Sequence, residues 1–182
     1  MKRWGNGAVG EDRRNKMKIE QAIENYQELK EHKRGDQHMN GFESVFEELL
    51  PAGYTLEGNK KVRENDYRNK CWDYSVFRDG DLAGVIELKS LHKSAGKNLN
   101  NRLEEAAGCA AIIKSGRPEV KRSYFIILDN IGSTLQDRME KFLQDCKSQE
   151  WYNSVSALVL NDGDEPRFLN GMSIQDMFKI YQ

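Results

Sequence analysis

Residues 72–90 are WDYSVFRDGDLAGVIELKS, and they decide the fold that we predict for this chain. Two runs of strand-forming residues flank the dipeptide Asp79-Gly80, which is typical of a β-hairpin turn. The returning run, which begins at Leu82, is apolar except for Glu87 and Lys89. Each of these charges is costly to desolvate on a buried strand unless it is paired or bound to a metal. The stretch therefore predicts a hairpin that carries a paired or metal-bound charge.

The spacing of the charged residues sets a condition on the turn. Side chains alternate faces along a strand, so Glu87 and Lys89 share a face. Directly opposed residues of an antiparallel pair also share a face. Asp73 therefore lies on the face of Glu87 and Lys89 only if the residue numbers of each opposed pair add up to an even number. A three-residue loop gives this total, whereas a two-residue turn pairs Asp73 with Ile86, and we predict the three-residue loop. Two carboxylates about 5 Å apart between their Cβ atoms repel unless a cation lies between them, and oxygen ligands with open positions suit Mg²⁺.

An acid followed on the next strand by acid-x-lysine resembles the pattern of the PD-(D/E)XK nuclease superfamily. The matching residues are Asp73 and then Glu87-Leu88-Lys89, while Trp72 stands where that superfamily has its proline. The alternative is that Glu87 and Lys89 form an exposed ion pair on an edge strand, worth ~0–1 kcal/mol.

The composition is that of a rather polar protein with 182 residues, of which 31% are charged and 38% hydrophobic. Such a chain suits one domain with a good core. The net charge of −1 gives no general basic surface, but Lys60 to Arg102 holds ten Lys and Arg against six acids, a local net of +4.

The three cysteines are widely spaced. Their spacing fits neither a zinc site nor a disulfide framework, which favours a reducing cytoplasm. Without an apolar run of transmembrane length or a signal peptide, we expect no membrane partner.

Hydrophobic periodicity predicts helices at residues 11–33, 42–50, 98–114, 133–147 and 174–180. It predicts strands at 54–56, 61–63, 123–128 and 155–160, in addition to the central hairpin. This order predicts an α/β fold with a mixed central sheet of about five strands sandwiched by helices. We expect a single domain over 1–182, with an N-terminal arm and helix at 1–40, a catalytic core at 41–160 and a C-terminal helix at 161–182.

The residues from Lys89 onward add a second resemblance. KSLHKSAGKNLNNRLEEAAGCA (89–110) resembles the stretch that begins at the catalytic lysine of the XhoI-type restriction endonucleases. The matching residues are Lys89, Ser90, Gly96, Asn98, Asn100, Asn101, Arg102, Glu104, Glu105, Ala106 and Gly108. The apolar run SYFIILD that follows is also similar to that family, so the resemblance covers residues 72–129. The chain is shorter than members of the family.

The resemblance implies a restriction-endonuclease-like core that hydrolyses phosphodiester bonds of double-stranded DNA with Mg²⁺, for which Mn²⁺ is expected to substitute. Asp73 and Glu87 would hold the metal together with the backbone carbonyl of Leu88, and the metal would activate a water and stabilise the leaving oxygen. Lys89 would orient that water and stabilise the developing charge. Glu43, at the rim of the apolar stripe of the helix at 42–50, would support a second metal; the alternative is a surface residue.

The loop and helix that follow the hairpin supply the candidate phosphate contacts. Lys93, Lys97 and Arg102 are suited to this role, since lysine offers a point charge and arginine a bidentate fork. His92 lies in the same loop. We favour a polar loop residue or a phosphate contact for His92 over a catalytic base.

Asn98, Asn101 and Glu105 share one face of the predicted helix with Arg102, at spacings of three and four residues. We predict that the two asparagines bind DNA and that Glu105 supports the site from behind. Helix capping and hydrogen bonds at the edge of the core are the alternative.

Three functions fit these residues. The first is a sequence-specific type II restriction enzyme that acts as a homodimer, because two symmetric strands need two sites. The second is a repair, recombination or phage-defence nuclease on the same core. The third is a non-catalytic DNA-binding protein, against which the charges of Glu87 and Lys89 on a buried strand argue.

Overall fold

The computed structural model of the chain describes residues 7–30, 35–92, 95–169 and 173–182. The chain divides into two compact units, residues 1–52 and 53–182. The single domain that we expect over 1–182 stays a prediction. No helix in the described ranges is long and apolar enough to span a membrane.

The first unit is helical and contains α1 (Gly7–Leu29), the 3₁₀ helix η1 (Gly35–Phe42) and α2 (Glu43–Leu49). Both predicted helices are present, α1 begins four residues earlier than predicted, and the predicted positions 31–33 lie outside the described residues. Apolar side chains at helical spacing explain why these segments fold as they do. The buried ones on α1 and α2 are Ile19, Ala22, Ile23, Tyr26, Val45 and Phe46.

The second unit is built on a six-stranded sheet with the order β1-β4-β5-β6-β7-β8. Its strands are β1 (Tyr54–Gly58), β4 (Tyr74–Arg78), β5 (Asp81–Leu91), β6 (Lys121–Asp129), β7 (Ser154–Leu160) and β8 (Arg167–Phe168). β5, β6 and β7 pair in parallel, and the other neighbours pair antiparallel. The mixed sheet confirms the predicted fold class, and β8 is an additional short strand that the sequence pattern did not predict.

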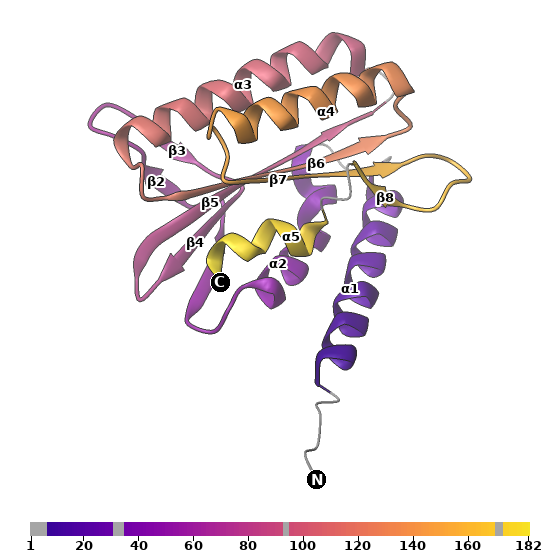
Figure 1. The fold of residues 1–182 in the computed structure, drawn as a ribbon, viewed down its shortest axis with the longest axis horizontal. Coiled ribbons are helices and arrows are strands. Elements are labelled where there is room, and N and C mark those ends of the chain that lie inside the picture. Colours follow the sequence, from indigo (N-terminus) through magenta and orange to yellow (C-terminus); the bar gives the residue numbers. More distant parts are fainter. Residues whose placement is uncertain (1–6, 31–34, 93–94, 170–172) are drawn as a thin grey trace. The chain divides into compact units, whose positions relative to one another are not determined.

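Helices cover both faces of this sheet. α3 (Ala95–Gly116) and α4 (Ser133–Ser148) lie side by side on one face, and α5 (Ile174–Phe178), followed by η3 (Lys179–Tyr181), lies on the other (Figure 1). Almost every residue of β6 and β7 is buried, as expected for parallel strands covered on both sides. Tyr181 crosses β5 at Gly84, where a Cβ atom would lie 2.1 Å from the tyrosine hydroxyl, so this close approach requires glycine.

A small second sheet consists of β2 (Lys61–Arg63) and β3 (Asn69–Cys71), which pair antiparallel. β3 was not predicted from the sequence. Val62 of β2 packs into a buried cluster that also contains Trp72, Val85 and Ile113. The loop between the strands packs against the end of α3, where a Cβ atom at Gly116 would lie 2.2 Å from the backbone oxygen of Glu64. The small hairpin is therefore held against α3 and the start of β5.

Candidate active site

The register of the central hairpin places Asp73 and Glu87 in line across β4 and β5. Tyr74 opposes Ile86 and Val76 opposes Gly84, pairs whose numbers add to an even total, as predicted. Asp73 directly precedes β4, and the same register extended by one residue places it opposite Glu87.

The turn itself differs from the prediction. Arg78 opposes Asp81, so the loop has two residues, and Asp79 and Gly80 have φ values of 52° and 86°. Positive φ at both central positions is typical of a type I′ turn. The predicted three-residue loop is therefore wrong. A β-bulge at Ala83 restores the even total instead, because it adds one unpaired residue to β5 between the turn and the site.

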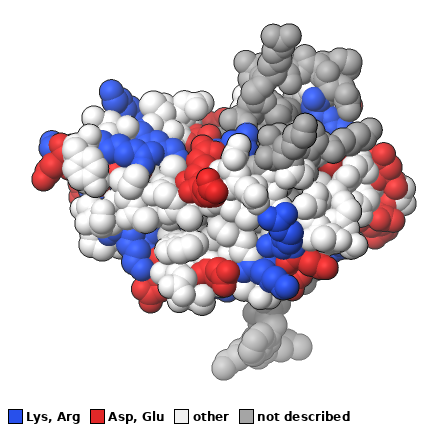
Figure 2. Space-filling model, turned by 90° about the horizontal axis from the view of Figure 1, so that it is seen from above, with Lys and Arg blue, Asp and Glu red and all other residues white. Residues whose placement is uncertain are grey.

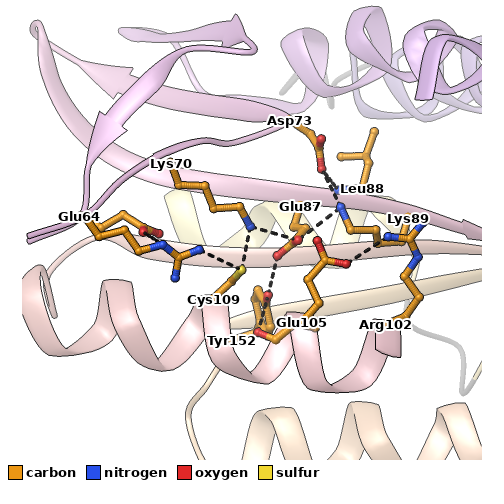
Figure 3. A network of polar contacts seen from close by, with 12 residues as sticks. Glu64, Lys70, Asp73, Glu87, Leu88, Lys89, Arg102, Glu105, Cys109 and Tyr152 are labelled. Atoms are coloured by element: carbon orange, nitrogen blue, oxygen red, sulfur yellow. Dashed lines mark hydrogen bonds and ion pairs between the residues drawn. The ribbon is translucent and has the colours of Figure 1, made fainter. Parts of the chain in front are cut away.

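Asp73, Glu87 and Lys89 lie in contact. The Lys89 Nζ atom is 3.2 Å from Glu87 Oε1 and 3.5 Å from Asp73 Oδ2, so one ammonium group joins both carboxylates. The backbone N–H of Leu88 donates a hydrogen bond to Asp73 Oδ2 at 2.7 Å. Since the N–H and C=O of a strand residue point to the same side, the Leu88 carbonyl also points toward the side of the strand on which Asp73 lies. Figure 3 shows the side chains of Asp73, Glu87 and Lys89 pointing toward one another at β5.

The site is buried and yet charged. The side chain of Glu87 is 1% exposed and that of Lys89 9%, whereas the side chain of Asp73, just before β4, is 24% exposed. Burial lowers the pKa of Lys89, but the charges of Glu87, Asp73 and Glu105 outweigh burial and raise this pKa above its usual value. Lys89 is therefore a cation at neutral pH that can donate hydrogen bonds. The buried ion pair differs from the exposed edge-strand pair that was the alternative.

Tyr152, just before β7, holds the second oxygen of Glu87. Its hydroxyl lies 2.9 Å from Glu87 Oε2 and 3.1 Å from the backbone oxygen of Ala106, two acceptors that share one proton. Burial and the nearby Glu87 carboxylate raise the pKa of Tyr152 well above its usual value, so the hydroxyl stays protonated. Sequence reasoning missed Tyr152, and no local motif could have revealed a partner 65 residues away.

Lys70 of β3 is a second lysine at the same carboxylate. Its Nζ atom lies 3.1 Å from Glu87 Oε1 and 2.9 Å from Cys109 Sγ, and 4.1 Å from the ring centre of Trp72. Figure 3 shows Lys70 and Lys89 approaching Glu87 from different sides. No pattern in the sequence indicated this contact, because β3 itself was not predicted.

The residues predicted to bind DNA are only partly described. Arg102 Nη1 lies 3.0 Å from Glu105 Oε2 on α3, which confirms that the two side chains share a face. Asn101 is exposed on the same helix. Lys93 and the side chains of Lys97 and Asn98 lie outside what the structure describes.

Other predicted residues take different positions. Glu43 is the first residue of α2, in the first unit, and its part in the site stays a prediction. His92 Nδ1 lies 3.1 Å from Asp129 Oδ2, and its Nε2 lies 3.4 Å from Ser90 Oγ. Ser90 points to the opposite face of β5 from Lys89. His92 is therefore oriented by Ser90 and Asp129.

The donor set at the site consists of oxygen atoms. In the described part of the chain, no three His, Cys, Asp or Glu side chains gather as a metal-binding group. Asp73 and Glu87 supply two carboxylates, and the Leu88 carbonyl offers a further oxygen. This set fits Mg²⁺, which is usually held by one or two carboxylates and keeps several water or phosphate ligands.

Charges of both signs are mixed on the outer surface of the helices that cover one face of the sheet. Over α3 and α4, Lys and Arg side chains are interspersed with Asp and Glu and form no single basic patch among the described residues in view (Figure 2). This agrees with the net charge of −1. Attraction for a polyanion must therefore come from local groups.

Comparisons with known proteins point to one family. The family model described as "Restriction endonuclease XhoI" matches residues 20–120. The type II restriction enzyme XhoI of Xanthomonas vasicola is 36% identical over an alignment of 85 residues, and the match covers 42% of this chain and 34% of that enzyme. The chain thus spans about a third of the length of this curated relative. No solved structure matches the chain. The range 20–120 contains Lys70, Asp73, Glu87 and Lys89, whereas Tyr152 lies beyond it.

Proposed function

The chain belongs to the XhoI restriction endonuclease family, and from this premise we propose that it is a Mg²⁺-dependent endonuclease that hydrolyses double-stranded DNA at specific sequences. The observation that carries the proposal is the contact of Lys89 with both Asp73 and Glu87 on a buried strand. An acid opposed to acid-x-lysine also supports membership of the PD-(D/E)XK superfamily.

Asp73, Glu87 and the Leu88 carbonyl are the proposed ligands of the metal. When bound, Mg²⁺ supplies a Lewis acid that polarises the scissile phosphate and lowers the pKa of a water molecule. Mn²⁺ has the same preference for oxygen ligands and should replace it. Tyr152 donates a hydrogen bond to Glu87 Oε2, whereas Oε1 is in contact with the two lysines.

Lys89 is the proposed catalytic cation. Its raised pKa keeps it protonated, so it donates hydrogen bonds to the attacking water and to the phosphate rather than accepting a proton. A fixed positive charge in a buried site stabilises negative charge that develops on the phosphate oxygens. Glu105 lowers the cost of keeping Lys89 charged, which is the supporting role proposed for it.

The N-terminal half of α3 and the loop before it form the proposed DNA contacts. Arg102 lies on the exposed side of α3 near the site, and its partner Glu105 is itself 43% exposed, so a phosphate can compete for the guanidinium. Lys93, Lys97, Asn98 and Asn101 complete this proposed surface. Glu43 is proposed to support a second metal or its water ligands.

A homodimer is proposed because cleavage of both strands at a symmetric sequence needs two active sites. Sedimentation velocity with and without DNA tests it. A sedimentation coefficient of a monomer under both conditions would contradict the dimer and leave the chemistry of the single site in place.

The function is tested by incubating wild-type protein with mixed plasmid and phage DNA, in Mg²⁺ or in EDTA. Lys89→Met is the inactive variant, and Lys61→Met is the matched control, since Lys61 is an exposed residue of β2. We expect discrete bands in Mg²⁺ with the wild type and the control, and none with Lys89→Met. Nicking or a smear that Lys89→Met abolishes would favour the repair or defence nuclease. DNA left uncut by every protein would contradict the enzyme and favour a DNA-binding role.

A further inference from the structure

Lys70 is a partly buried charged group that the proposed reaction does not use. Its side chain is 17% exposed and lies between Glu87 Oε1, Cys109 Sγ and the Trp72 ring. A cation beside a carboxylate, a thiol and an aromatic face has favourable contacts with all three. Lys70 is therefore held in a defined position at the site.

The small hairpin directs Lys70 inward. Lys70 opposes Val62 across β2 and β3, and opposed residues share a face. Val62 is buried in the cluster that lies against α3 and β5, so Lys70 points toward the same side. The close packing of Glu64 on Gly116 anchors the far end of the hairpin. The contact with Glu87 thus follows from the packing of the whole hairpin.

The charged groups that the structure describes in direct contact with Glu87 and Asp73 carry charges that sum to zero. Among the described side chains, the carboxylates of Asp73 and Glu87 meet the ammonium groups of Lys70 and Lys89. A divalent cation added to this set would leave an excess of two positive charges in a buried place. Such an excess of positive charge is unfavourable unless one of the lysine ammonium groups moves away or a negatively charged group binds at the site.

Glu87 Oε1 is the atom at which this competition takes place. Oε2 is occupied by the Tyr152 hydroxyl, whereas both lysines lie on Oε1. A metal that joins Asp73 to Glu87 needs the same oxygen. Lys89 also touches Asp73, but Lys70 touches Glu87 alone of the two acids, so Lys70 can leave without breaking the link between them.

We propose that Lys70 is a displaceable cation that occupies Glu87 until a divalent metal enters together with a DNA phosphate. Lys70 is a positioning residue: it keeps the Glu87 carboxylate in place in the metal-free protein, and it makes binding of metal and binding of DNA depend on each other. The inference rests on the proposed function for the identity of the phosphate, but the competition between Lys70 and metal does not require DNA.

The test measures Mn²⁺ binding to the full-length protein without DNA, from the electron paramagnetic resonance signal of free Mn²⁺. We expect weak binding by the wild type and about tenfold tighter binding by Lys70→Met, the size expected when one like charge is removed a few ångströms away. Lys61→Met, on the outer side of the same hairpin, should match the wild type. Lys70→Arg keeps the charge and should also bind weakly.

If folded Lys70→Met binds Mn²⁺ as weakly as the wild type or more weakly, the proposal is overturned. That result would mean that Lys70 only supports the structure of the site and does not compete with the metal. Lys70→Gln, which keeps a polar group beside Cys109, gives the same comparison if Lys70→Met does not fold. Adding a phosphorothioate DNA duplex should increase the Mn²⁺ affinity of the wild type at least tenfold. The same duplex should increase the Mn²⁺ affinity of Lys70→Met by a smaller factor. If Lys70→Met binds Mn²⁺ more tightly than the wild type but neither the wild type nor any variant cleaves DNA, the proposed function is refuted. The inference that Lys70 competes with the metal then still holds.

Discussion

The two hairpins of the second unit each bring one lysine to the same oxygen of Glu87. Lys89, from the eleven-residue strand β5, lies 3.2 Å from Oε1, and Lys70, from the three-residue strand β3, lies 3.1 Å from it. Lys89 also contacts Asp73, whereas the other neighbours of Lys70 are a thiol and an indole ring. The two lysines thus lie at nearly the same distance from Glu87 Oε1 but differ in their other contacts. Lys89 contacts both acids, whereas Lys70 contacts Glu87.

The largest expected effect separates these two lysines. Lys89→Met should lower the rate of DNA cleavage by about 10²–10³-fold at saturating Mg²⁺, the usual loss for a fixed group that stabilises developing charge. Lys70→Met should keep the rate within about tenfold under the same conditions. Single-turnover cleavage as a function of Mg²⁺ concentration measures both. Equal losses at saturating Mg²⁺ would break the distinction between the lysines.

Asp73→Asn tests the first strand of the central hairpin, and we expect about 10²-fold slower cleavage. The asparagine amide oxygen can still accept the hydrogen bond from the Leu88 N–H, so the loss of thermal stability should be limited to the loss of the ion pair with Lys89. Asp79→Asn is the matched control at the other end of the hairpin, because asparagine tolerates the positive φ of the turn. Cleavage by Asp73→Asn at the rate of the control would contradict the role of Asp73.

The sequence predicted the central hairpin well because its signal is local. Alternation along β5 set the common face of Glu87 and Lys89, and the even register follows from the need to bring Asp73 to the same face. The turn was predicted wrongly because a β-bulge at Ala83 gives the same parity as a longer loop. A bulge has no strong residue signature beyond the small residues found here.

Part of the small hairpin and Tyr152 could not be predicted for a different reason. The strand at 61–63 was predicted and is confirmed as β2, but β3 and its pairing with β2 were not predicted, because three residues are too few to show a period and the pairing depends on the cluster around Val62 and Trp72. Tyr152 and Glu87 are separated in the sequence by α3, β6 and α4, and only the packing of these elements brings the two side chains together. Contacts of this kind depend on tertiary packing and leave no pattern within one segment.

Tyr152→Phe tests the group that holds Glu87 in place between the two lysines. Loss of the hydroxyl leaves Glu87 Oε2 without this buried donor and should cost about 1–3 kcal/mol in the free energy of unfolding. Tyr124→Phe is the matched control, because the buried Tyr124 hydroxyl has no hydrogen-bond partner among the described residues. Urea unfolding of both variants measures the difference. Equal destabilisation would show that the Tyr152 hydroxyl does not support Glu87.

Two glycines of α3 allow the small hairpin to be disturbed without touching the central one. In Gly116→Ala the new Cβ atom would lie 2.2 Å from the Glu64 backbone oxygen, and we expect a loss of about 1–3 kcal/mol of stability. Gly108 has no atom within 4 Å of an added Cβ, so Gly108→Ala should stabilise by about 0.5–1 kcal/mol. Thermal unfolding compares them, and a stable Gly116→Ala protein would contradict the close packing of the hairpin.

The smallest effect concerns the pH dependence of stability at the loop of the small hairpin. Burial raises the pKa of Glu64, and Arg68 and Lys70 offset this only in part. A raised folded-state pKa favours folding below the ordinary value of 4.5, and this contribution is lost as the pH rises through the folded value. As the pH rises from 4.5 to 7, the free energy of unfolding should therefore decrease less for Glu64→Gln than for the wild type. Parallel pH profiles in urea unfolding would contradict the raised pKa.

The proposed metal site consists of Asp73, Glu87 and the Leu88 carbonyl, beside Lys89. Anomalous diffraction from crystals soaked in Mn²⁺, with metal-free crystals as the reference, locates a bound ion. We expect one Mn²⁺ ion about 2.1 Å from oxygens of both carboxylates, with the Lys70 ammonium moved away from Glu87 Oε1. An ion bound elsewhere, or a Mn²⁺ soak that leaves both carboxylates without an anomalous peak, would contradict it.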